Sequence, residues 1–340
     1  MTLCVAWIRN EKKSQELVFA TDSTLTGGEK WNHGIKLFEL PRKDCLICFA
    51  GETNRAYPLI LNLISTLKHD EKLQDSRLDI QEVLNRVEST FTDLVKSIFD
   101  KPSGDSSYIG SEAKFIFGGW SWKQSRFRIW TLKYITEIES FVAKEETQEE
   151  ERSRVCVFLG DPEGNIDKGE NDIASIAANK YQDLLTKKGK FDGKLDMEPL
   201  EVLVGMSRDR GIYYVDGALQ IAKIYSSATN EFFGIKWPSE QGIYTFLGKK
   251  YETHTRPRVK YYDPDSCDIT TDDVPKCLRN IEDFNNTEDY SFLVSCYSQE
   301  SNYLKSDLTD DEREKLISIF HYHSYRVFIQ NAEKEEQVTE

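Results

Sequence analysis

The sequence predicts an α+β fold over residues 1–250, a four-layer αββα sandwich of two antiparallel sheets, each covered by a pair of helices; residues 251–340 form a C-terminal extension. Three observations predict this fold. The chain has 340 residues, of which 39% are hydrophobic, so it can bury a large core. Its predicted elements come in groups, which is typical of α+β proteins rather than of alternating βα units. The layered arrangement also buries the apolar face of every predicted element.

The first fifty residues predict two β-hairpins. Apolar runs at 3–8 and 17–21 lie on either side of a charged turn. Residues 35–40 and 45–50 flank a second turn, which begins at Pro41. Short apolar or alternating runs that flank a polar turn are typical of antiparallel strand pairs. Each hairpin is therefore expected to form one edge-to-edge pair within a sheet.

The periodicity of the apolar residues predicts the elements that follow. Apolar positions recur at the helical period over 53–68 and, more clearly, over 79–99. Later helices are expected at 171–187 and 197–208, and strands at 113–118, 127–132, 136–143, 155–159, 219–224 and 231–235. In the C-terminal extension one helix is expected, over 308–322, capped by Thr309 or Asp310.

The charge and the apolar pattern exclude several kinds of partner. The net charge is −14 and the basic residues are scattered, so neither nucleic acid nor a membrane surface is an expected partner. No run of about eighteen apolar residues is present, so no segment is expected to span a bilayer. The N-terminus lacks the basic region of a secretory signal. We therefore expect a cytoplasmic protein with reduced thiols.

Several motifs that can bind metals are better explained structurally. Cys45 and Cys48 have the Cys-x-x-Cys spacing, but a spacing of three on a strand sends the two thiols to opposite faces. The segment 263–268 begins like a calcium loop and lacks its glycine and its final acid. His321 and His323 have no partner ligands in the sequence. The sequence therefore predicts neither a metal nor an organic cofactor.

Three patterns in the first fifty residues resemble the proteasome family. Thr2 opens the first strand directly after the initiator Met, and Ala20-Thr-Asp-Ser-Thr-Leu-Thr-Gly-Gly28 is similar to the turn after the second strand. Lys36-Leu37 and Cys48-Phe-Ala-Gly51 are similar to a third strand and the turn before a helix. The resemblance is strongest to the bacterial HslV-type protease, covers about 2–235 and is loose after 52. It implies an N-terminal nucleophile (Ntn) hydrolase.

The resemblance assigns the nucleophile to Thr2. A threonine hydroxyl is a weak nucleophile at neutral pH and needs a base within hydrogen-bond reach. An N-terminal threonine carries that base itself, because an α-amine has a pKa of about 7.7–8.0, close to cellular pH. Removal of Met1 would expose this amine on Thr2. The residue would then act as both nucleophile and base.

The resemblance also implies the groups around the nucleophile. Lys36 would tune the amine through its charge, and Asp22 would hold that lysine. Backbone N–H groups of the turn from Cys48 to Gly51 would stabilise the oxyanion of an attacked amide. The backbone of Thr26 would pair with an extended peptide substrate as an added strand.

Four positions depart from the family pattern or match it loosely. Cys48 stands where the family has a glycine, and Asp161 stands where it has a serine. Asp209 is the nearest candidate for the family's late aspartate, displaced by a few residues, and Asp216 lies near the place of its late serine. These departures affect the proton network more than the nucleophile.

The residues and the resemblance together favour a threonine peptidase that cleaves amide bonds, most of all peptide bonds. Family members act in rings or larger assemblies, so self-association into a homo-oligomer is expected, and an unfolding or targeting partner is a further option. The alternative is a catalytically inactive proteasome-like scaffold or partner-binding subunit, with 251–340 as an interaction surface. A third interpretation keeps the hydrolase and changes the substrate to a small amide.

Overall fold

The structure is a computed structural model, and it describes residues 2–11, 14–26, 29–74, 78–97, 113–146, 155–160, 172–190, 193–212, 215–237, 243–251, 256–257, 259–270, 284, 287–297, 305, 307–316, 318–319 and 322. The chain divides into two compact units, Met1–Thr271 and Asp272–Glu340, and each is described by itself. None of the helices in the described part of the chain has the length and apolar character that crossing a bilayer requires.

The larger of two sheets in the first unit has nine strands, in the order β12-β11-β10-β9-β2-β1-β8, with β13 paired to β10 and β14 to β13. Its strands are β1 (Leu3–Glu11), β2 (Ser14–Thr21), β8 (Cys156–Gly160), β9 (Gln220–Tyr225), β10 (Thr229–Lys236), β11 (Tyr244–Phe246), β12 (Lys249–Tyr251), β13 (Tyr261–Asp263) and β14 (Asp268–Thr270). Every neighbouring pair is antiparallel except β10 with β13.

The smaller sheet has five strands in chain order, all antiparallel. They are β3 (Leu37–Leu40), β4 (Arg42–Gly51), β5 (Ala113–Ser121), β6 (Arg126–Ile135) and β7 (Ser140–Glu145). A short 3₁₀ helix, η2 (Thr136–Ile138), lies between β6 and β7. Each strand pairs with the next one along the chain: short connections join β3 to β4 and β5 to β6, whereas α1 to α3 lie in the connection from β4 to β5.

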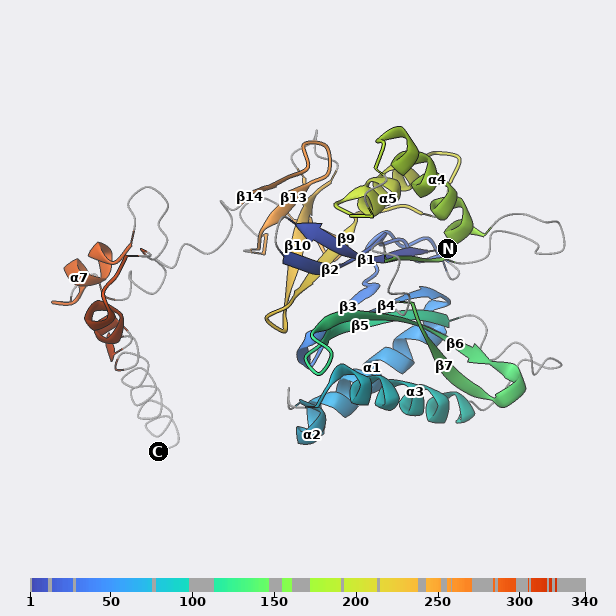
Figure 1. The fold of residues 1–340 in the computed structure, drawn as a ribbon, viewed down its shortest axis with the longest axis horizontal. Helices are drawn as coiled ribbons and strands as arrows, with labels where there is room; N and C mark the ends of the chain where they lie inside the picture. The colour runs from blue at the N-terminus through green and yellow to red at the C-terminus, as the bar shows by residue number, and fades with distance from the viewer. Residues whose placement is uncertain are drawn as a thin grey trace, which may run out of the picture. The chain divides into compact units, whose positions relative to one another are not determined.

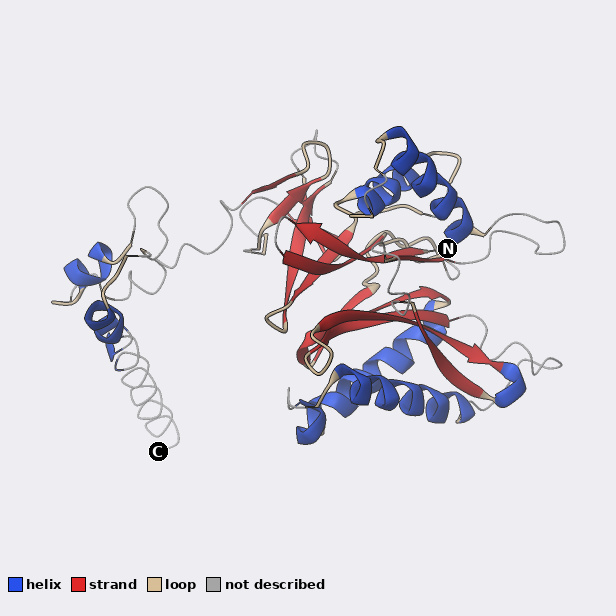
Figure 2. Cartoon of the chain, in the orientation of Figure 1, coloured by secondary structure: helices blue, strands red, loops and turns tan. Residues whose placement is uncertain are grey.

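Helices pack on the outer faces of both sheets (Figures 1 and 2). The helices α1 (Thr53–His69) and α3 (Ile80–Lys96) lie against the smaller sheet, with the short α2 (Glu71–Gln74) between them in sequence. On the larger sheet, α4 (Ile173–Lys187) contacts β8, and α5 (Glu198–Arg208) contacts β1 and β2. The apolar stripe of each helix thus meets a sheet, as the helical periodicity requires.

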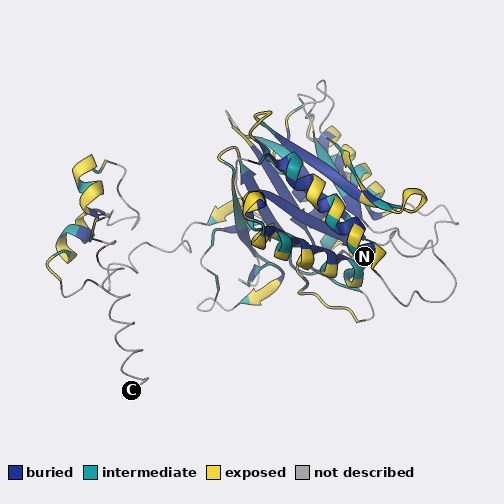
Figure 3. Ribbon diagram, turned by 90° about the horizontal axis from the view of Figure 1, so that it is seen from below, coloured by how far each residue is buried: buried dark blue, intermediate teal, exposed yellow. Residues whose placement is uncertain are grey.

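Three apolar clusters hold these elements together, and the sheets are buried on their inner faces (Figure 3). The cluster that contains Phe19 joins the two sheets, because its members come from β1, β2 and β9 as well as from β3 to β6. Phe91 belongs to the cluster under α1 and α3, and Trp7 to the cluster under α4 and α5. Most residues of β1, β2 and β4 are therefore buried, which explains their near-continuous apolar sequences.

The prediction of a four-layer αββα sandwich of the Ntn hydrolase type is corrected by this architecture. The fold is α+β and is dominated by two large, mostly antiparallel sheets of nine and five strands. The larger sheet continues through β10 to β14, and β11, β12 and β14 contribute no residue to the apolar cluster under α4 and α5, so the helices cover only part of it (Figure 1). The sequence pattern concealed this extension because β11 to β14 have three residues each, too few to show a period.

Most of the locally predicted elements are confirmed within a few residues. Both N-terminal hairpins, the four long helices and the strands predicted at 113–118, 127–132, 155–159, 219–224 and 231–235 are present. The strand predicted at 136–143 begins later, because η2 precedes β7. Cys45 and Cys48 lie on opposite faces of β4, in different apolar clusters, as the spacing predicted.

The described residues of the second unit include two short helical segments. The helix α7 (Tyr290–Ser295), which the sequence did not predict, packs with Phe284 and Leu316 into a small apolar cluster. Residues 310–316 are helical, in the region where a helix was expected. Thr309 caps this helix reciprocally with Glu312: the Thr309 hydroxyl accepts from the Glu312 N–H at 3.3 Å, and the carboxylate accepts from the Thr309 N–H at 2.8 Å.

Candidate active site

The centre of the candidate site is the carboxylate of Asp22, which is fully buried just after β2. Its Oδ1 accepts a hydrogen bond from the backbone N–H of Leu3 at 3.0 Å. Its Oδ2 accepts from the backbone N–H of Thr24 at 3.0 Å and from the ammonium of Lys36 at 2.8 Å. One carboxylate therefore joins the start of β1, the turn after β2 and the lysine that precedes β3.

Lys36 is also fully buried, and its backbone is held by a residue that the sequence analysis missed. Gln220, at the start of β9, accepts hydrogen bonds through Oε1 from the N–H groups of Lys36 at 3.0 Å and Leu37 at 3.2 Å. Its Nε2 donates to the carbonyl of Gly34 at 2.6 Å. The signal that could have found Gln220 is a polar side chain at a buried position of an otherwise apolar strand, 0% exposed in the structure.

Thr2 lies immediately before β1 and is 3% exposed. The N–H group that donates a hydrogen bond to Asp22 Oδ1 belongs to the peptide bond between Thr2 and Leu3. The same carboxylate binds the Lys36 ammonium, so the peptide bond after Thr2 and the Lys36 side chain share one hydrogen-bond acceptor, Asp22. The structure thus brings together all three residues that the sequence predicted as catalytic.

The segment from Cys48 to Gly51 is the last part of β4 and not a separate turn. The N–H of Phe49 donates to the carbonyl of Lys36 at 3.2 Å, so this donor is already paired. Gly51 has a φ of +107°, a backbone conformation that favours glycine, and it ends the strand. The backbone of this segment and that of Lys36 are therefore direct neighbours.

The two cysteines near the site are buried, and neither resembles a reactive thiol. Burial raises the pKa of the Cys48 thiol well above its ordinary value, and the adjacent Cys4 thiol raises it further. The Cys4 thiol donates a hydrogen bond to the carbonyl of Phe49 at 2.9 Å. Because the thiolate is the nucleophilic form, Cys48 is a packing residue here and not a competing nucleophile.

The late aspartates fall in different places. Asp209 follows α5 and is exposed, with its carboxylate 3.6 Å from Lys180 and bonded to the N–H of Gly211. Asp216 pairs with Lys30 at 2.7 Å, and Gly217 packs against the turn that contains Ser23. Asp216 therefore lies beside the turn that follows Asp22, whereas the partners of Asp209 come from α4 and its own loop.

The ionisation of Asp216 follows from these contacts. Partial burial raises the pKa of its carboxyl, but the hydrogen bonds from Lys30 and from the N–H of Gly217, together with the charge of Lys30, outweigh burial, and the net pKa is lower than the ordinary value. Of the other predicted residues, Thr26 lies in the partly buried loop after β2, and Asp161 lies outside the described residues.

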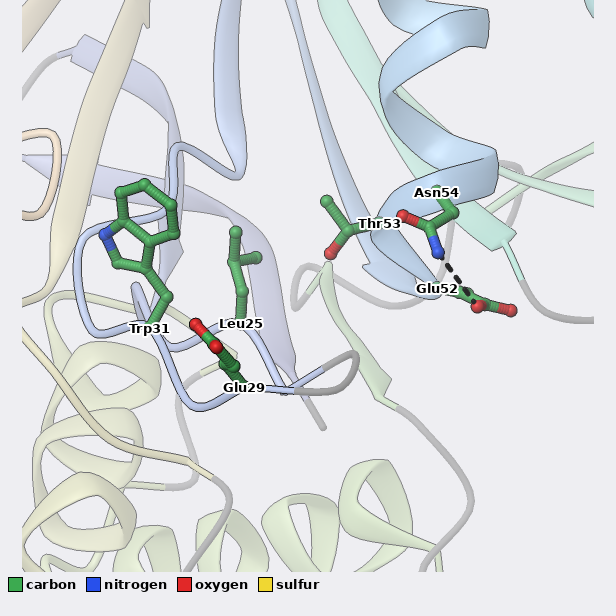
Figure 4. A pocket seen from close by; sticks show the side chains of 6 residues that line it. All are labelled: Leu25, Glu29, Trp31, Glu52, Thr53 and Asn54. Atoms are coloured by element: carbon green, nitrogen blue, oxygen red, sulfur yellow. Dashed lines mark hydrogen bonds between the residues drawn. The ribbon is translucent and has the colours of Figure 1, made fainter.

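A pocket of about 300 Å³ opens next to this site (Figure 4). It is lined by Leu25, Glu29, Trp31, Glu52, Thr53 and Asn54. Its two walls are the loop after Asp22 and the start of α1, which follows Gly51. The described parts of the chain contain no group of three or more His, Cys, Asp or Glu residues that could hold a metal ion.

Comparisons with known proteins give a likeness in structure. No protein-family profile and no curated protein matches the sequence. A solved structure of the helical assembly of the Anbu complex from Pseudomonas aeruginosa is similar over 68% of this chain and 85% of that chain, with 15% identity and a TM-score of 0.47. Anbu (ancestral beta-subunit) from Yersinia bercovieri is similar over 68% and 86%, with 14% identity and a TM-score of 0.43.

These findings correct the family assignment made from the sequence. The chain is similar to Anbu proteins, which are proteasome-like but form a family distinct from the proteasome β-subunits and the HslV-type protease that the first fifty residues resemble. The misassignment has a simple cause. The residues that carried the resemblance surround one buried ion pair, and short motifs around such a pair do not separate related families.

Proposed function

We propose that this chain hydrolyses amide bonds, with the hydroxyl of Thr2 as the nucleophile once Met1 has been removed. The observation that carries the proposal is the fully buried Asp22–Lys36 ion pair, whose carboxylate also binds the N–H of Leu3. A buried ion pair is costly to desolvate and is weak support for a purely stabilising role. Its carboxylate holds the backbone directly after Thr2, and this position suits a catalytic role.

In the proposed reaction the α-amine of Thr2 takes the proton of the Thr2 hydroxyl as its oxygen attacks the amide carbonyl. The amine then returns the proton to the leaving nitrogen, and an ester on Thr2 remains. Water activated by the same amine hydrolyses the ester and regenerates the hydroxyl. An amine that titrates at about pH 7.7–8.0 can both accept and release this proton under cellular conditions.

Lys36 and Asp22 support this chemistry through charge. Within the described residues the Lys36 ammonium donates one hydrogen bond, to Asp22, although an ammonium carries three N–H donors. The remaining donors are free to face the Thr2 oxygen as negative charge develops on it. A positive charge nearby also favours the neutral form of the amine, which is the form that accepts a proton.

The proposed oxyanion donor is the N–H of Gly51. The N–H of Phe49 is already bonded to Lys36, whereas Gly51 ends β4 with a φ of +107° that turns the backbone out of the strand. A peptide substrate would pair as an added strand with the backbone near Thr26, in the loop after β2. Peptides are the preferred substrate class in this proposal, and small amides are the second.

The decisive experiment combines an intact-mass measurement with a Thr2→Ala variant. Protein purified without an N-terminal tag should lack one Met, and it should hydrolyse peptides in a fluorogenic library. The variant should lose at least about a thousandfold in activity, because it lacks the nucleophile. Thr186→Ala, on the exposed face of α4, is the matched control and should retain full activity. Activity that persists in Thr2→Ala would exclude this mechanism.

A non-catalytic, proteasome-like subunit is the second candidate, and one observation favours it. Thr2 is only 3% exposed with Met1 in the chain, so a substrate has little access to its hydroxyl. Retention of Met1, absence of hydrolysis and a large homo-oligomer in light scattering would favour this function.

A further inference from the structure

The pocket beside the site has two walls, which come from different elements. In the loop after β2, Leu25 and Trp31 exchange backbone hydrogen bonds at 2.7 and 2.8 Å. The side chain of Leu25 packs directly on Gly34, where an added Cβ would come within 2.3 Å of Leu25 Cγ. The opposite wall is the first turn of α1 with Glu52 before it. The pocket is therefore a built feature of the fold rather than a gap between loops.

The lining of the pocket combines negative charge with an open aromatic face. Figure 4 shows Leu25, Glu29 and Trp31 on one side and Glu52, Thr53 and Asn54 on the other. The Trp31 side chain is 63% exposed, although it is one of the largest apolar groups in the chain. A carboxylate from each wall and an indole face are the groups that recognise a cation, through ion pairing and cation–π contact.

Nearby positive charges do not cancel the two glutamates. Lys30, next to Glu29 in the chain, is bound to Asp216 at 2.7 Å. Arg55, on the first turn of α1, does not line the pocket. The N-terminus of α1 adds a positive dipole equivalent to about half a charge, which is less than the two full charges of the carboxylates. The pocket therefore has a negative potential.

The pocket is joined to the proposed catalytic groups by very short stretches of chain. Leu25 follows Asp22 by three residues, and Glu52 follows Gly51 directly. A substrate whose carbonyl reaches Gly51 would thus place one neighbouring side chain at the mouth of the pocket. The volume of about 300 Å³ lies at the small end of the range for ligand pockets, which suits one long side chain.

We infer that this pocket binds a cationic side chain of the substrate, a lysine or an arginine next to the cleaved bond. The inference rests on the proposed hydrolysis for its catalytic consequence. Glu29 and Glu52 are the specificity residues, and Trp31 is the apolar wall along which the aliphatic part of the side chain lies.

Peptide cleavage tests the inference with a set of peptides that differ only in the side chain before the scissile bond, as Lys, norleucine or Glu. The wild type should prefer Lys to norleucine by at least about tenfold in kcat/KM. This is the effect expected when two partly exposed ion pairs and one cation–π contact stabilise the bound lysine. Glu29→Gln/Glu52→Gln should reduce this ratio about tenfold. Glu71→Gln/Glu137→Gln makes the same charge change at exposed positions and should keep it. No preference for Lys, or a preference that the double variant keeps, would overturn the inference.

A binding measurement separates this inference from the proposed function. Titration calorimetry of the Thr2→Ala protein with benzamidine and with neutral benzamide should show tighter binding of benzamidine. The Glu29→Gln/Glu52→Gln changes should remove that difference, and the control pair should not. If no peptide is cleaved but benzamidine binds in this way, the hydrolase proposal fails and the cation pocket stands. Equal binding of benzamidine and benzamide to the Thr2→Ala protein would refute the cation pocket and would not bear on the hydrolase proposal.

Discussion

Two of the buried ion pairs in the described part of the chain, Arg42–Asp44 and Asp22–Lys36, are built differently. Arg42 and Asp44, at the start of β4, are 4% and 5% exposed. The guanidinium binds both carboxylate oxygens of Asp44 and donates to the carbonyls of Leu73 and Leu78, each at 2.8 Å. This pair connects the second hairpin to α2 and to the segment before α3, and most of its donors are used.

The Asp22–Lys36 pair has the opposite distribution of hydrogen bonds. Its carboxylate is bound by three donors, whereas the ammonium makes one described hydrogen bond, to that carboxylate. A buried charge with unused donors is expensive to keep unless those donors act on something else. The comparison teaches that the saturated pair serves stability and the unsaturated pair, beside Thr2, marks the candidate site.

The largest effect is expected from Lys36→Met, which removes the unsaturated cation. Peptide hydrolysis should fall by roughly 10²–10⁴-fold, the range for a group that assists proton transfer. The variant should also unfold at lower temperature, because Asp22 is left unpaired. The double variant Asp22→Asn/Lys36→Met should recover stability without activity. Activity of Lys36→Met within twofold of wild type would contradict the functional role of the Asp22–Lys36 pair.

The next effect concerns the saturated pair. Arg42→Met should lower the free energy of unfolding by roughly 3–5 kcal/mol, because a buried carboxylate loses its partner, while kcat/KM of the folded protein stays unchanged. Chemical denaturation measures the first quantity and peptide hydrolysis the second. Arg86→Met, which breaks a solvent-exposed pair with Asp70, is the control and should cost less than about 1 kcal/mol. A selective loss of kcat/KM in Arg42→Met would assign it a catalytic role and contradict the distinction.

Gln220 sharpens the comparison because it positions one member of the functional pair. Gln220→Leu leaves the N–H groups of Lys36 and Leu37 without an acceptor and should destabilise the fold by about 2 kcal/mol. Its kcat should fall about tenfold with KM unchanged, since the lysine is misplaced and the pocket is intact. Gln220→Glu keeps the acceptor and should restore part of kcat. An equal effect of both variants on kcat would indicate a structural role alone.

The smallest effect is expected at Glu198, which belongs to a partly solvated cluster. Burial raises the pKa of its carboxyl, but the hydrogen bonds from Lys190 and from the N–H of Asp196 outweigh burial and lower it below the ordinary 4.5. A lowered pKa in the folded state means that the ionised form stabilises the fold above pH 4.5 and that this contribution is lost as the pH falls through the folded pKa.

Glu198→Gln should therefore cost about 1 kcal/mol at pH 7 and progressively less as the solution becomes more acidic. Denaturation at a series of pH values measures the difference from wild type. Glu201→Gln is the matched control, because Glu201 lies on α5 like Glu198 and pairs with Lys188. It should change stability less, because the Glu201 carboxylate is more exposed than that of Glu198. A cost for Glu198→Gln that stays constant with pH would show that packing, and not charge, matters at this position.

Local patterns were sufficient for the elements that a short segment determines alone. The hairpins β1–β2 and β3–β4 were predicted because each has two apolar runs around a polar turn, and α3 because its apolar residues keep the helical period. The strands β11 to β14 were not predicted, because each has three residues, too few to show a period, and β13 also pairs in parallel with β10 across an intervening segment. The predicted sandwich therefore missed the far end of the larger sheet.

The candidate site divides in the same way. The sequence by itself, through short motifs that resemble the proteasome family, implied that Thr2, Asp22 and Lys36 belong to one site. Only the tertiary structure decided that one carboxylate binds two of these strand ends, that Gln220 supports Lys36 from 184 residues away, and that Asp209 lies elsewhere. The physical reason is that side-chain type is local, whereas burial and hydrogen-bond partners depend on which segments the sheets bring together.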